Sequence, residues 1–469
     1  MIDQRSHSHA GGNLLPMGWT ETNLSNIVVV NPKNRDVTPQ SSGFIPMALA
    51  PTDFNGNLQF EEREWEEIKK KYTHFANGDI IFAKVTPCFE NGKAAIVAGL
   101  PNGIGAGSSE FYVLRPLGEG ISASYIFANI KSHEFMQAGA ENMTGAVGLR
   151  RVPRKFVEGF TINLPPLAEQ KVIADKLDTL LAKVESIKAR LDNIPQILKT
   201  FRQSVLVAAV SGKFLKEWNA SSKTLLDIAD FQNGYAFKSG WFLNEGTYQV
   251  IKLGNIRDGR LALENSPAYV DESVAEEFRK FEPQQGDTLI SMTGTRFKKD
   301  YGFGCLVGDI RGLLINQRVG RLIPKLTIIT PEYLNLFIRS DLFRDQFFEG
   351  ETGGVNQGNV GSKHILSISI DLPDIDIQSK VVSYVEQLFA NADNIEQQVR
   401  VAQTQVNNLT QSILAKAFRG ELTADWRSAN PELVIGYNSA ESLLERIQAQ
   451  RETIGKQPKS RRTAVKKNS

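Results

Sequence analysis

The sequence predicts two copies of a mixed α/β (α+β) domain, joined by long antiparallel coiled-coil helices in a pseudo-two-fold tandem repeat. Three observations predict this fold class: an internal repeat at an offset of 208 residues, an apolar heptad pattern late in each repeat, and short β-rich runs elsewhere. A chain of 469 residues is too long for one hydrophobic core. We therefore expect several domains that derive from one duplicated unit.

The internal repeat is clearest near the end of each copy, where residues 203–212 (QSVLVAAVSG) match residues 411–420 (QSILAKAFRG). Between residues 20 and 75 the match is lost. Elsewhere the same offset aligns Gly78-Asp79 with Gly286-Asp287, Thr144-Gly145 with Thr352-Gly353, Leu164-Pro165 with Leu372-Pro373, Gln170 with Gln378, and Trp218 with Trp426. So many matches at one offset indicate a duplication.

The better-kept part of each copy is predicted to be helical, because its apolar residues alternate four- and three-residue steps, as in a coiled-coil seam. Gly212 and Gly420 follow the pattern as C-terminal helix stops. Pro195 lies inside the first pattern, so we expect a kink or break there and none in the second copy. The residues expected to form the seam and to dock partners are Leu177, Leu180, Val184, Ile187, Leu191, Leu388, Ile395, Val399, Leu409 and Ile413.

The remaining parts alternate β-rich runs with Gly, Asn and Pro turn signals, and each ends in a helical stretch. The runs are 79–85, 110–116, 287–292 and 318–324, and the helical stretches are 122–135 and 330–343. Leu443, Leu444 and Ile447 mark one apolar face of a further short helix. The predicted parts are a disordered N-terminus (1–15), a first mixed α/β domain (16–165), a first helical region (166–218), a second mixed α/β domain (219–373), a second helical region (374–426), and a C-terminal short helix with a disordered basic tail (427–469).

Several classes of protein are excluded by the sequence. No run approaches the roughly 20 apolar residues that a membrane span needs, and the first fifteen residues lack the apolar segment of a secretory signal. Two cysteines, Cys88 and Cys305, cannot form a disulfide framework, so we expect a cytoplasmic protein. No phosphate-binding glycine loop, metal-ligand spacing or catalytic constellation is found, which predicts a non-enzymatic chain that binds no cofactor or metal itself.

Local clusters of charge are more informative than the net charge of +2. Residues 451–469 contain seven Lys or Arg residues and one Glu, so the rest of the chain is slightly acidic. A body of this charge binds nucleic acid through local basic patches or with a more basic partner.

Three segments are rich in Lys and Arg: 84–93, 150–155 and 295–302. The first and third also contain Thr and aromatic residues, and the first contains Asn. Such mixtures suit contact with phosphates together with base edges. Because the loops occupy similar places in both copies, we expect them to contact double-stranded DNA. The candidate DNA-binding residues are Lys84, Thr86, Asn91, Lys93, Arg150, Arg151, Arg154, Arg296, Lys298, Lys299 and Arg318.

From Leu15-Pro16-Met17-Gly18-Trp19 to about Arg451, the chain resembles the specificity subunit of type I restriction–modification enzymes. The most specific stretches are 164–171 (LPPLAEQK) and 409–423 (LTQSILAKAFRGELT), together with Trp426. Residues 78–93 (GDIIFAKVTPCFENGK) are similar to one recurrent class of that family's target recognition domain. The second copy departs from the family pattern at 373–378 (PDIDIQ), where the full Pro-Pro-Leu-Ala-Glu-Gln motif is absent.

The resemblance implies two target recognition domains that read a bipartite, asymmetric DNA site, with the helical regions as spacer and docking site. It also implies two modification (methyltransferase) subunits and restriction/translocase subunits as partners. Those partners would carry S-adenosylmethionine, ATP and Mg²⁺, and no membrane is involved. Two alternatives remain open at this point: a coiled-coil scaffold holding two ligand-binding domains without DNA binding, and a fused nuclease or methyltransferase. Salt-dependent DNA binding would argue against the first, and inactivity of the purified chain would argue against the second.

Overall fold

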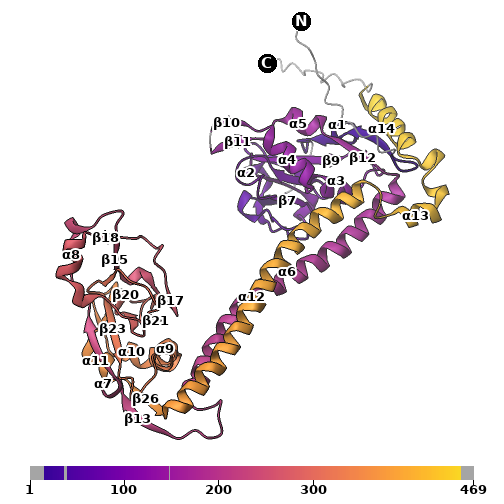
Figure 1. Cartoon of the computed structure of the whole chain (residues 1–469). Helices are drawn as coiled ribbons and strands as arrows, with labels where there is room; N and C mark the ends of the chain where they lie inside the picture. The colour runs from indigo at the N-terminus through magenta and orange to yellow at the C-terminus, as the bar shows by residue number, and fades with distance from the viewer. Residues whose placement is uncertain (1–14, 36–39, 147, 456–469) are drawn as a thin grey trace, which may run out of the picture. The chain divides into compact units, whose positions relative to one another are not determined.

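The computed structural model describes residues 15–35, 40–146 and 148–455. The predicted disorder of the basic tail and of nearly all the N-terminal segment therefore lies outside the described residues. The chain divides into two compact units, Met1–Arg190 with Ala402–Ser469, and Leu191–Val401. Both units contain a mixed α/β part and a portion of each long helix (Figure 1).

The first unit contains two four-stranded sheets, which lie in the order β2-β9-β6-β7 and β4-β3-β8-β5. All neighbours are antiparallel except β3 and β8, which are parallel. Strand β1 pairs with β12, and β10 pairs with β11. The bounds are β1 Thr20–Asn23, β2 Val28–Val30, β3 Ser41–Ile45, β4 Glu61–Glu64, β5 Thr73–Ala76, β6 Ile80–Ala83, β7 Ala94–Ile96, β8 Ile104–Gly107, β9 Phe111–Pro116, β10 Thr144–Ala146, β11 Leu149–Arg151 and β12 Thr161–Leu164.

The second unit contains a four-stranded sheet, β14-β23-β19-β21, and two three-stranded sheets, β18-β15-β22 and β20-β25-β24. Strand β13 pairs with β26, and β16 pairs with β17. The bounds are β13 Ala220–Thr224, β14 Ala229–Asn233, β15 Tyr248–Ile251, β16 Ile256–Arg257, β17 Arg260–Leu261, β18 Tyr269–Val270, β19 Thr288–Ser291, β20 Thr293–Thr295, β21 Gly304–Leu306, β22 Leu313–Ile315, β23 Val319–Pro324, β24 Glu351–Gly353, β25 Gln357–Val360 and β26 Ser369–Pro373.

Short helices complete each unit, and several cover the sheets. The helical stretch predicted at 122–135 is two helices, because Ser132 accepts a hydrogen bond from the amide of Phe135 and begins a new helix. Ser340 does the same in the second unit. The bounds are α1 Leu24–Ile27, α2 Trp65–Ile68, α3 Ala123–Ile130, α4 His133–Glu141, α5 Arg154–Gly159, α7 Leu225–Ile228, α8 Glu272–Glu277, α9 Pro331–Arg339, α10 Asp341–Glu349, α11 Ser362–Ser367, α13 Ala424–Ala429 and α14 Ala440–Gly455.

The duplication is visible in the pairing of the strands. Ile80 of β6 faces Leu114 of β9, and Thr288 of β19 faces Leu322 of β23, so both positions are shifted by 208 residues. The kept glutamines also have the same role. Gln170 accepts a hydrogen bond from the amide of Ser122 at 2.8 Å, and Gln378 accepts one from the amide of Thr330 at 2.9 Å. Both bonds fix the start of a sheet-covering helix to the start of a long helix.

The long helices are α6 (Leu167–Val210) and α12 (Ile375–Phe418), and each has 44 residues. We expected a kink or break at Pro195; the break is wrong, because α6 is one continuous helix through that residue. A proline inside a helix removes one backbone hydrogen bond and costs about 3 kcal/mol. Nearby packing offsets this cost: Leu198 is buried, and Arg202 forms ion pairs with Asp393 and Glu396 of α12.

The heptad pattern describes only part of the helix pairing. Leu177, Val184 and Val399 are buried, whereas Leu180, Leu191, Leu388 and Ile413 are half-buried. The expectation of one continuous buried seam is wrong at Ile187, Ile395 and Leu409, which are 44%, 45% and 44% exposed. An α-helix of 3.6 residues per turn drifts by about 20° per heptad away from a strict seven-residue repeat. Neighbouring residues such as Leu181 and Leu414 are buried instead.

The predicted C-terminal short helix is present as α14, whose Leu443 and Ile447 are buried against the first unit (Figure 1). Within the described ranges, no helix has both the length and the apolar character that crossing a membrane requires.

Candidate nucleic-acid interface

In the first unit, the loop 84–93 lies beside the hairpin formed by β10 and β11. The backbone amide of Thr86 donates to the carbonyl of Arg150 at 3.0 Å, and the amide of Arg150 donates to the Thr86 hydroxyl at 3.0 Å. The amide of Val152 donates to the carbonyl of Lys84 at 2.8 Å. These bonds join two of the predicted basic clusters, which are about 60 residues apart in the sequence, into one surface.

The cations of this surface are held by carboxylates and carbonyls. Arg151 donates twice to Glu110, at 2.9 and 2.8 Å, and this bond holds the pKa of Glu110 below its usual value. Arg150 pairs with Glu90 at 3.2 Å, and Arg154 pairs with Glu158 at 2.8 Å. The carboxylates orient the three arginines. The arginine side chains are themselves partly exposed, so they still reach solvent.

The predicted lysines of the loop have different environments. Lys84 is half-buried, and its ammonium donates to the carbonyl of Ser109 at 2.7 Å. Lys93 is also half-buried, and its ammonium donates to the carbonyl of Met47 at 2.8 Å. Asn91 is exposed. Lys84, Thr86, Arg150 and Arg151 are therefore brought together, while Lys93 anchors the far end of the loop.

Lys131, which sequence reasoning missed, holds the same loop from beneath. Its ammonium donates to the carbonyl of Gly92 at 2.7 Å and to that of Thr52 at 2.6 Å. Burial lowers the pKa of Lys131 to about 8, an effect that the charges of Asp53 and Glu185 oppose. Lys93 and Lys131 thus both fix the loop, through hydrogen bonds to backbone carbonyls. A lysine whose partners are distant backbone carbonyls gives no local sequence signal.

The second unit has a loop and hairpin at the corresponding place. Strand β20 leads into the turn at 296–299, and β25 pairs with both β20 and β24. Arg296 pairs with Glu351 at 3.0 Å, and its amide donates to the carbonyl of Asn356 at 3.3 Å. Glu351 also accepts a hydrogen bond from the hydroxyl of Tyr301.

The other cations predicted in this unit surround the turn. Lys298 and Lys299 are exposed, and the ammonium of Lys299 lies 4.8 Å from the centre of the Phe348 ring. Arg318 is exposed, and its carbonyl accepts a hydrogen bond from the amide of Met292, which directly precedes β20. Arg296, Lys298, Lys299 and Arg318 therefore belong to one basic region.

The two hairpins are equivalent in register. Thr144 pairs with Arg151, and Thr352 pairs with Asn359, so both partners are shifted by 208 residues. Gly145 and Gly353 have φ of +124° and +122°, and a Cβ on either would lie within 3 Å of a backbone oxygen across the hairpin. Only glycine adopts this conformation readily. The glycine of the Thr-Gly pair kept in both copies is therefore required by the backbone of the hairpin.

Exposed apolar side chains at the loops and hairpins are a feature that sequence reasoning missed. Phe297 is 78% exposed, Val355 is 76% exposed, and Leu149 is 53% exposed. Phe297 lies between Arg296 and Lys298, and Leu149 precedes Arg150. Val355 precedes Asn356, whose carbonyl accepts from the amide of Arg296. Apolar side chains in DNA-binding proteins contact thymine methyl groups or unstack base steps. Their sequence signal is weak, because periodicity alone does not separate an exposed Phe from a buried one.

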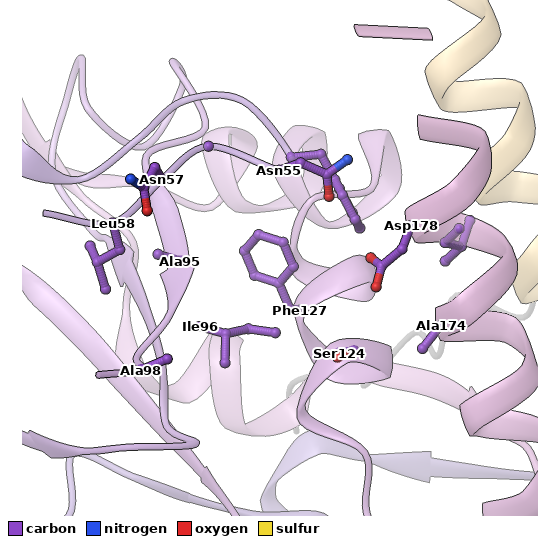
Figure 2. A pocket seen from close by; sticks show the side chains of 13 residues that line it. Asn55, Asn57, Leu58, Ala95, Ile96, Ala98, Ser124, Phe127, Ala174 and Asp178 are labelled. Atoms are coloured by element: carbon purple, nitrogen blue, oxygen red, sulfur yellow. The ribbon is translucent and has the colours of Figure 1, made fainter. Parts of the chain in front are cut away.

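A separate pocket of about 540 Å³ lies in the first unit between the loop 54–58 and helix α6. Figure 2 shows Phe127 among the side chains that line it, with Asp178 on the α6 side. Burial raises the pKa of Asp178, and the charge of Asp175 adds to this effect. None of the predicted DNA-binding residues lines this pocket, so it is distinct from the loop-and-hairpin surface.

Two units that present the same basic loop and hairpin define the class of a duplicated DNA-recognition protein. The chain belongs to the family of type I restriction–modification DNA specificity subunits. The model of this family, described as the type I restriction modification DNA specificity domain, matches residues 16–196 and 216–402. The chain is thus the DNA sequence-specificity component of such a system, a non-catalytic recognition subunit that acts in a complex with DNA and other subunits.

Named relatives and solved structures agree with this assignment. The chain is 32% identical to the type I restriction enzyme EcoKI specificity subunit of Escherichia coli (strain K12), over 96% of this chain and 98% of that protein. It is 37% identical to the EcoBI specificity subunit of Escherichia coli, over 68% of this chain and 70% of that protein. The crystal structure of the HsdS subunit from Thermoanaerobacter tengcongensis has a TM-score of 0.59 at 19% identity, covering 88% of this chain and 99% of that chain, and therefore shares the fold.

Proposed function

We propose that each unit recognises one half of a bipartite, asymmetric DNA site through its loop-and-hairpin surface. The observation that supports this most directly is the equivalent register of the two hairpins beside loops of different sequence. A common backbone then presents different side chains, such as Thr86 and Arg150 in one unit and Arg296 and Phe297 in the other. A shared frame with divergent side chains suits a target whose two halves differ.

Within this surface we assign two kinds of contact. Exposed cations position the phosphates, and the residues of the hairpin tips reach the base edges. Arg150, Arg151 and Arg296 are held by carboxylates, so they are pre-oriented, which reduces the side-chain entropy that binding costs. The recognition domains proposed for these contacts span residues 16–165 and 219–373.

We expect Lys84→Ala, Lys93→Ala and Arg296→Ala to weaken DNA binding by the assembled complex. Loss of one phosphate contact lowers the log–log salt slope by about 1, and loss of a bidentate base contact costs about 1–3 kcal/mol at one position. The measurement is DNA affinity as a function of salt concentration. Lys70→Ala, at an exposed lysine outside both surfaces, is the control. Unchanged affinity in all three variants would remove these side chains from the interface.

We also infer the assembly in which the chain acts. The helical regions 166–218 and 374–426 would serve as spacer and as docking site for two modification subunits, with restriction/translocase subunits joining the complex. In that assembly, S-adenosylmethionine, ATP and Mg²⁺ belong to the partner subunits. The exposed aliphatic residues Ile187, Ile395 and Leu409 support docking on the helices, because the helix pair itself leaves them accessible to a partner.

The experiment that tests the proposed recognition is a domain exchange. We expect that replacing residues 16–160 with the equivalent domain of another specificity subunit changes one half of the methylated site and leaves the other half intact. The reason is that the contacts of each hairpin and its loop lie within one unit. Methylation mapping of cells that express the exchanged chain with its partners gives the result.

The reciprocal exchange of residues 219–369 is the matched control, and it should alter only the opposite half. If either exchange changed both halves together, the assignment of one half-site to each unit would be wrong.

A further inference from the structure

The C-terminal helix α14 covers one face of the first unit. This face is formed by α1 and by residues 117–121, which follow β9. Leu443 and Ile447 of α14 are 6% and 5% exposed, and Arg451 donates to the carbonyl of Ser25 in α1 at 3.0 Å. The helix seats closely because the face has small residues: a Cβ on Gly120 would lie 2.3 Å from Leu443.

The corresponding face of the second unit is formed by α7 and by residues 325–329, which follow β23. The local backbone is the same in both units. The amide of Leu117 donates to the carbonyl of Ile27 at 2.8 Å, and the amide of Lys325 donates to the carbonyl of Ile228 at 2.9 Å. Thus α7 corresponds to α1, and the offset of 208 places Leu326 and Ile328 where Gly118 and Gly120 stand.

In the second unit this face is apolar and open. Leu226, Leu326 and Ile328 are 59%, 67% and 36% exposed, and we call these three residues the uncovered face. Leu226 and the segment that contains Leu326 and Ile328 are neighbours, because the ammonium of Lys325, which directly precedes Leu326, donates to the carbonyl of Leu226 at 2.8 Å. In the part of the chain that the structure describes, the one helix of the α14 type is packed on the first unit. Leu226 corresponds to Ser25, so all three positions are larger and more apolar than in the covered face.

Exposed carboxylates lie at the border of the uncovered face, together with the ammonium of Lys325. The carboxylate of Asp230 lies 4.0 Å from Lys325 and is 72% exposed. Asp374 and Asp376, at the beginning of α12, are also exposed, and the side chain of Gln378 ties this part of α12 to the carbonyl of Ile328 at 3.0 Å. An occupant with basic residues beside its apolar stripe matches this border.

We infer that the uncovered face binds an amphipathic helix with a basic flank, supplied by a partner subunit of the restriction–modification complex. The amphipathic character of the occupant follows from the first unit, where the equivalent face holds an amphipathic helix with Leu443 inward and Arg451 at its edge. Its basic flank follows from the carboxylates at the border of the uncovered face. Contiguous exposed aliphatic residues on an otherwise polar surface mark interaction sites. In the first unit α14 already covers the equivalent face, so only the uncovered face of the second unit is open to a partner. Each chain therefore binds one such helix, even if it binds two copies of the partner subunit. The inference rests on the proposed assembly with partner subunits.

The test compares the double variant Leu226→Ser/Leu326→Ser with the wild-type chain. Both side chains are more than half exposed, so the fold of the free chain is kept. The matched control is Ile310→Ser/Leu342→Ser, which removes two aliphatic residues of the same unit that are each 40% exposed. Each chain is mixed with purified modification and restriction subunits, and affinity and stoichiometry are measured by sedimentation and native mass spectrometry. Hydrogen exchange at 225–228 and 325–329 is followed in parallel.

We expect the double variant to lose at least tenfold in affinity for one partner copy, and the control to bind as the wild type does. Partner binding should protect the amides of 225–228 and 325–329 in the wild type. Equal affinity of variant and wild type without such protection would overturn the inference and leave the domain-exchange result unaffected. Concentration-dependent self-association of the free chain, abolished by the double variant, would instead assign the uncovered face to a second copy and also overturn it.

Discussion

Glu169→Ala is expected to destabilise the first unit by about 3–5 kcal/mol, because it removes the acceptor of a buried charged network. Glu169 is fully buried and accepts hydrogen bonds from the indole of Trp19 at 2.8 Å, the hydroxyl of Thr423 at 2.6 Å and the guanidinium of Arg427 at 2.8 Å. Arg427 is only 11% exposed, so the substitution leaves a buried cation without its carboxylate. The free energy of unfolding from denaturant titration is the measurement.

Two further variants separate charge from packing. Glu169→Gln keeps one side-chain oxygen, which at the Oε1 position can still accept from Thr423 and Arg427, while the acceptor for Trp19 at Oε2 is lost. It should therefore lose less stability than Glu169→Ala. Adding Arg427→Ala to Glu169→Ala should recover part of the loss, because the unpaired cation is then gone and contacting residues are not additive. A Glu169→Ala chain within 1 kcal/mol of the wild type would show that the network contributes little.

The role of Glu169 illustrates what a sequence does and does not contain. The stretch 164–171 stands out through family resemblance, yet its central carboxylate has partners 150, 254 and 258 residues away. Position 377 in the second copy is Ile, so the duplication gives no hint of the network either. Gln170, by contrast, has an equivalent at Gln378 with the same backbone partners, and there the repeat alone indicates a shared structural role.

Elements with strong local signals were predictable. Strands β6, β9, β19 and β23 lie inside the four predicted β-rich runs, and α14 carries the predicted apolar face. Signals that depend on tertiary contacts failed. The proline rule predicted a kink or break at Pro195, but no break occurs, and contacts of α6 with α12 such as the Arg202–Asp393 ion pair lie nearby. The heptad rule placed Ile187 and Ile395 inside a seam, although the helix turn carries them outward.

The sequence predicted which loops form the candidate DNA surface, but not how their side chains are oriented. Basic residues near 84–93 and 150–155 lie on one surface, because backbone hydrogen bonds join the loop to the hairpin. Spacing cannot show that Lys93 is directed to the carbonyl of Met47, since the two residues meet only through the fold. The exposure of Phe297 likewise follows from the turn that β20, β24 and β25 support.

The second large effect is expected at Asp287, which directly precedes β19 in the second unit. Asp287 pairs with Arg321 of β23 at 2.5 Å, and their side chains are 4% and 10% exposed. The carboxylate also accepts the amide of Gln284 at 2.6 Å. Asp287→Ala leaves Arg321 buried without its partner, which costs about 3–5 kcal/mol. Hydrogen exchange of β19 and β23 measures the loss of stability in this unit.

The first unit provides the matched comparison, because Asp79 is the repeat equivalent of Asp287. Asp79 pairs with Arg115, which lies two residues further along the equivalent strand and so on the same face of the sheet. Arg115 is 32% exposed, so water can solvate its charge after Asp79→Ala. We therefore expect Asp79→Ala to destabilise β6 and β9 less than Asp287→Ala destabilises β19 and β23. Equal losses of stability in the two units would mean that solvent access to the arginine does not control the destabilisation. The hydrogen bond that each aspartate accepts from a backbone amide, of Ala76 in the first unit and of Gln284 in the second, would then dominate.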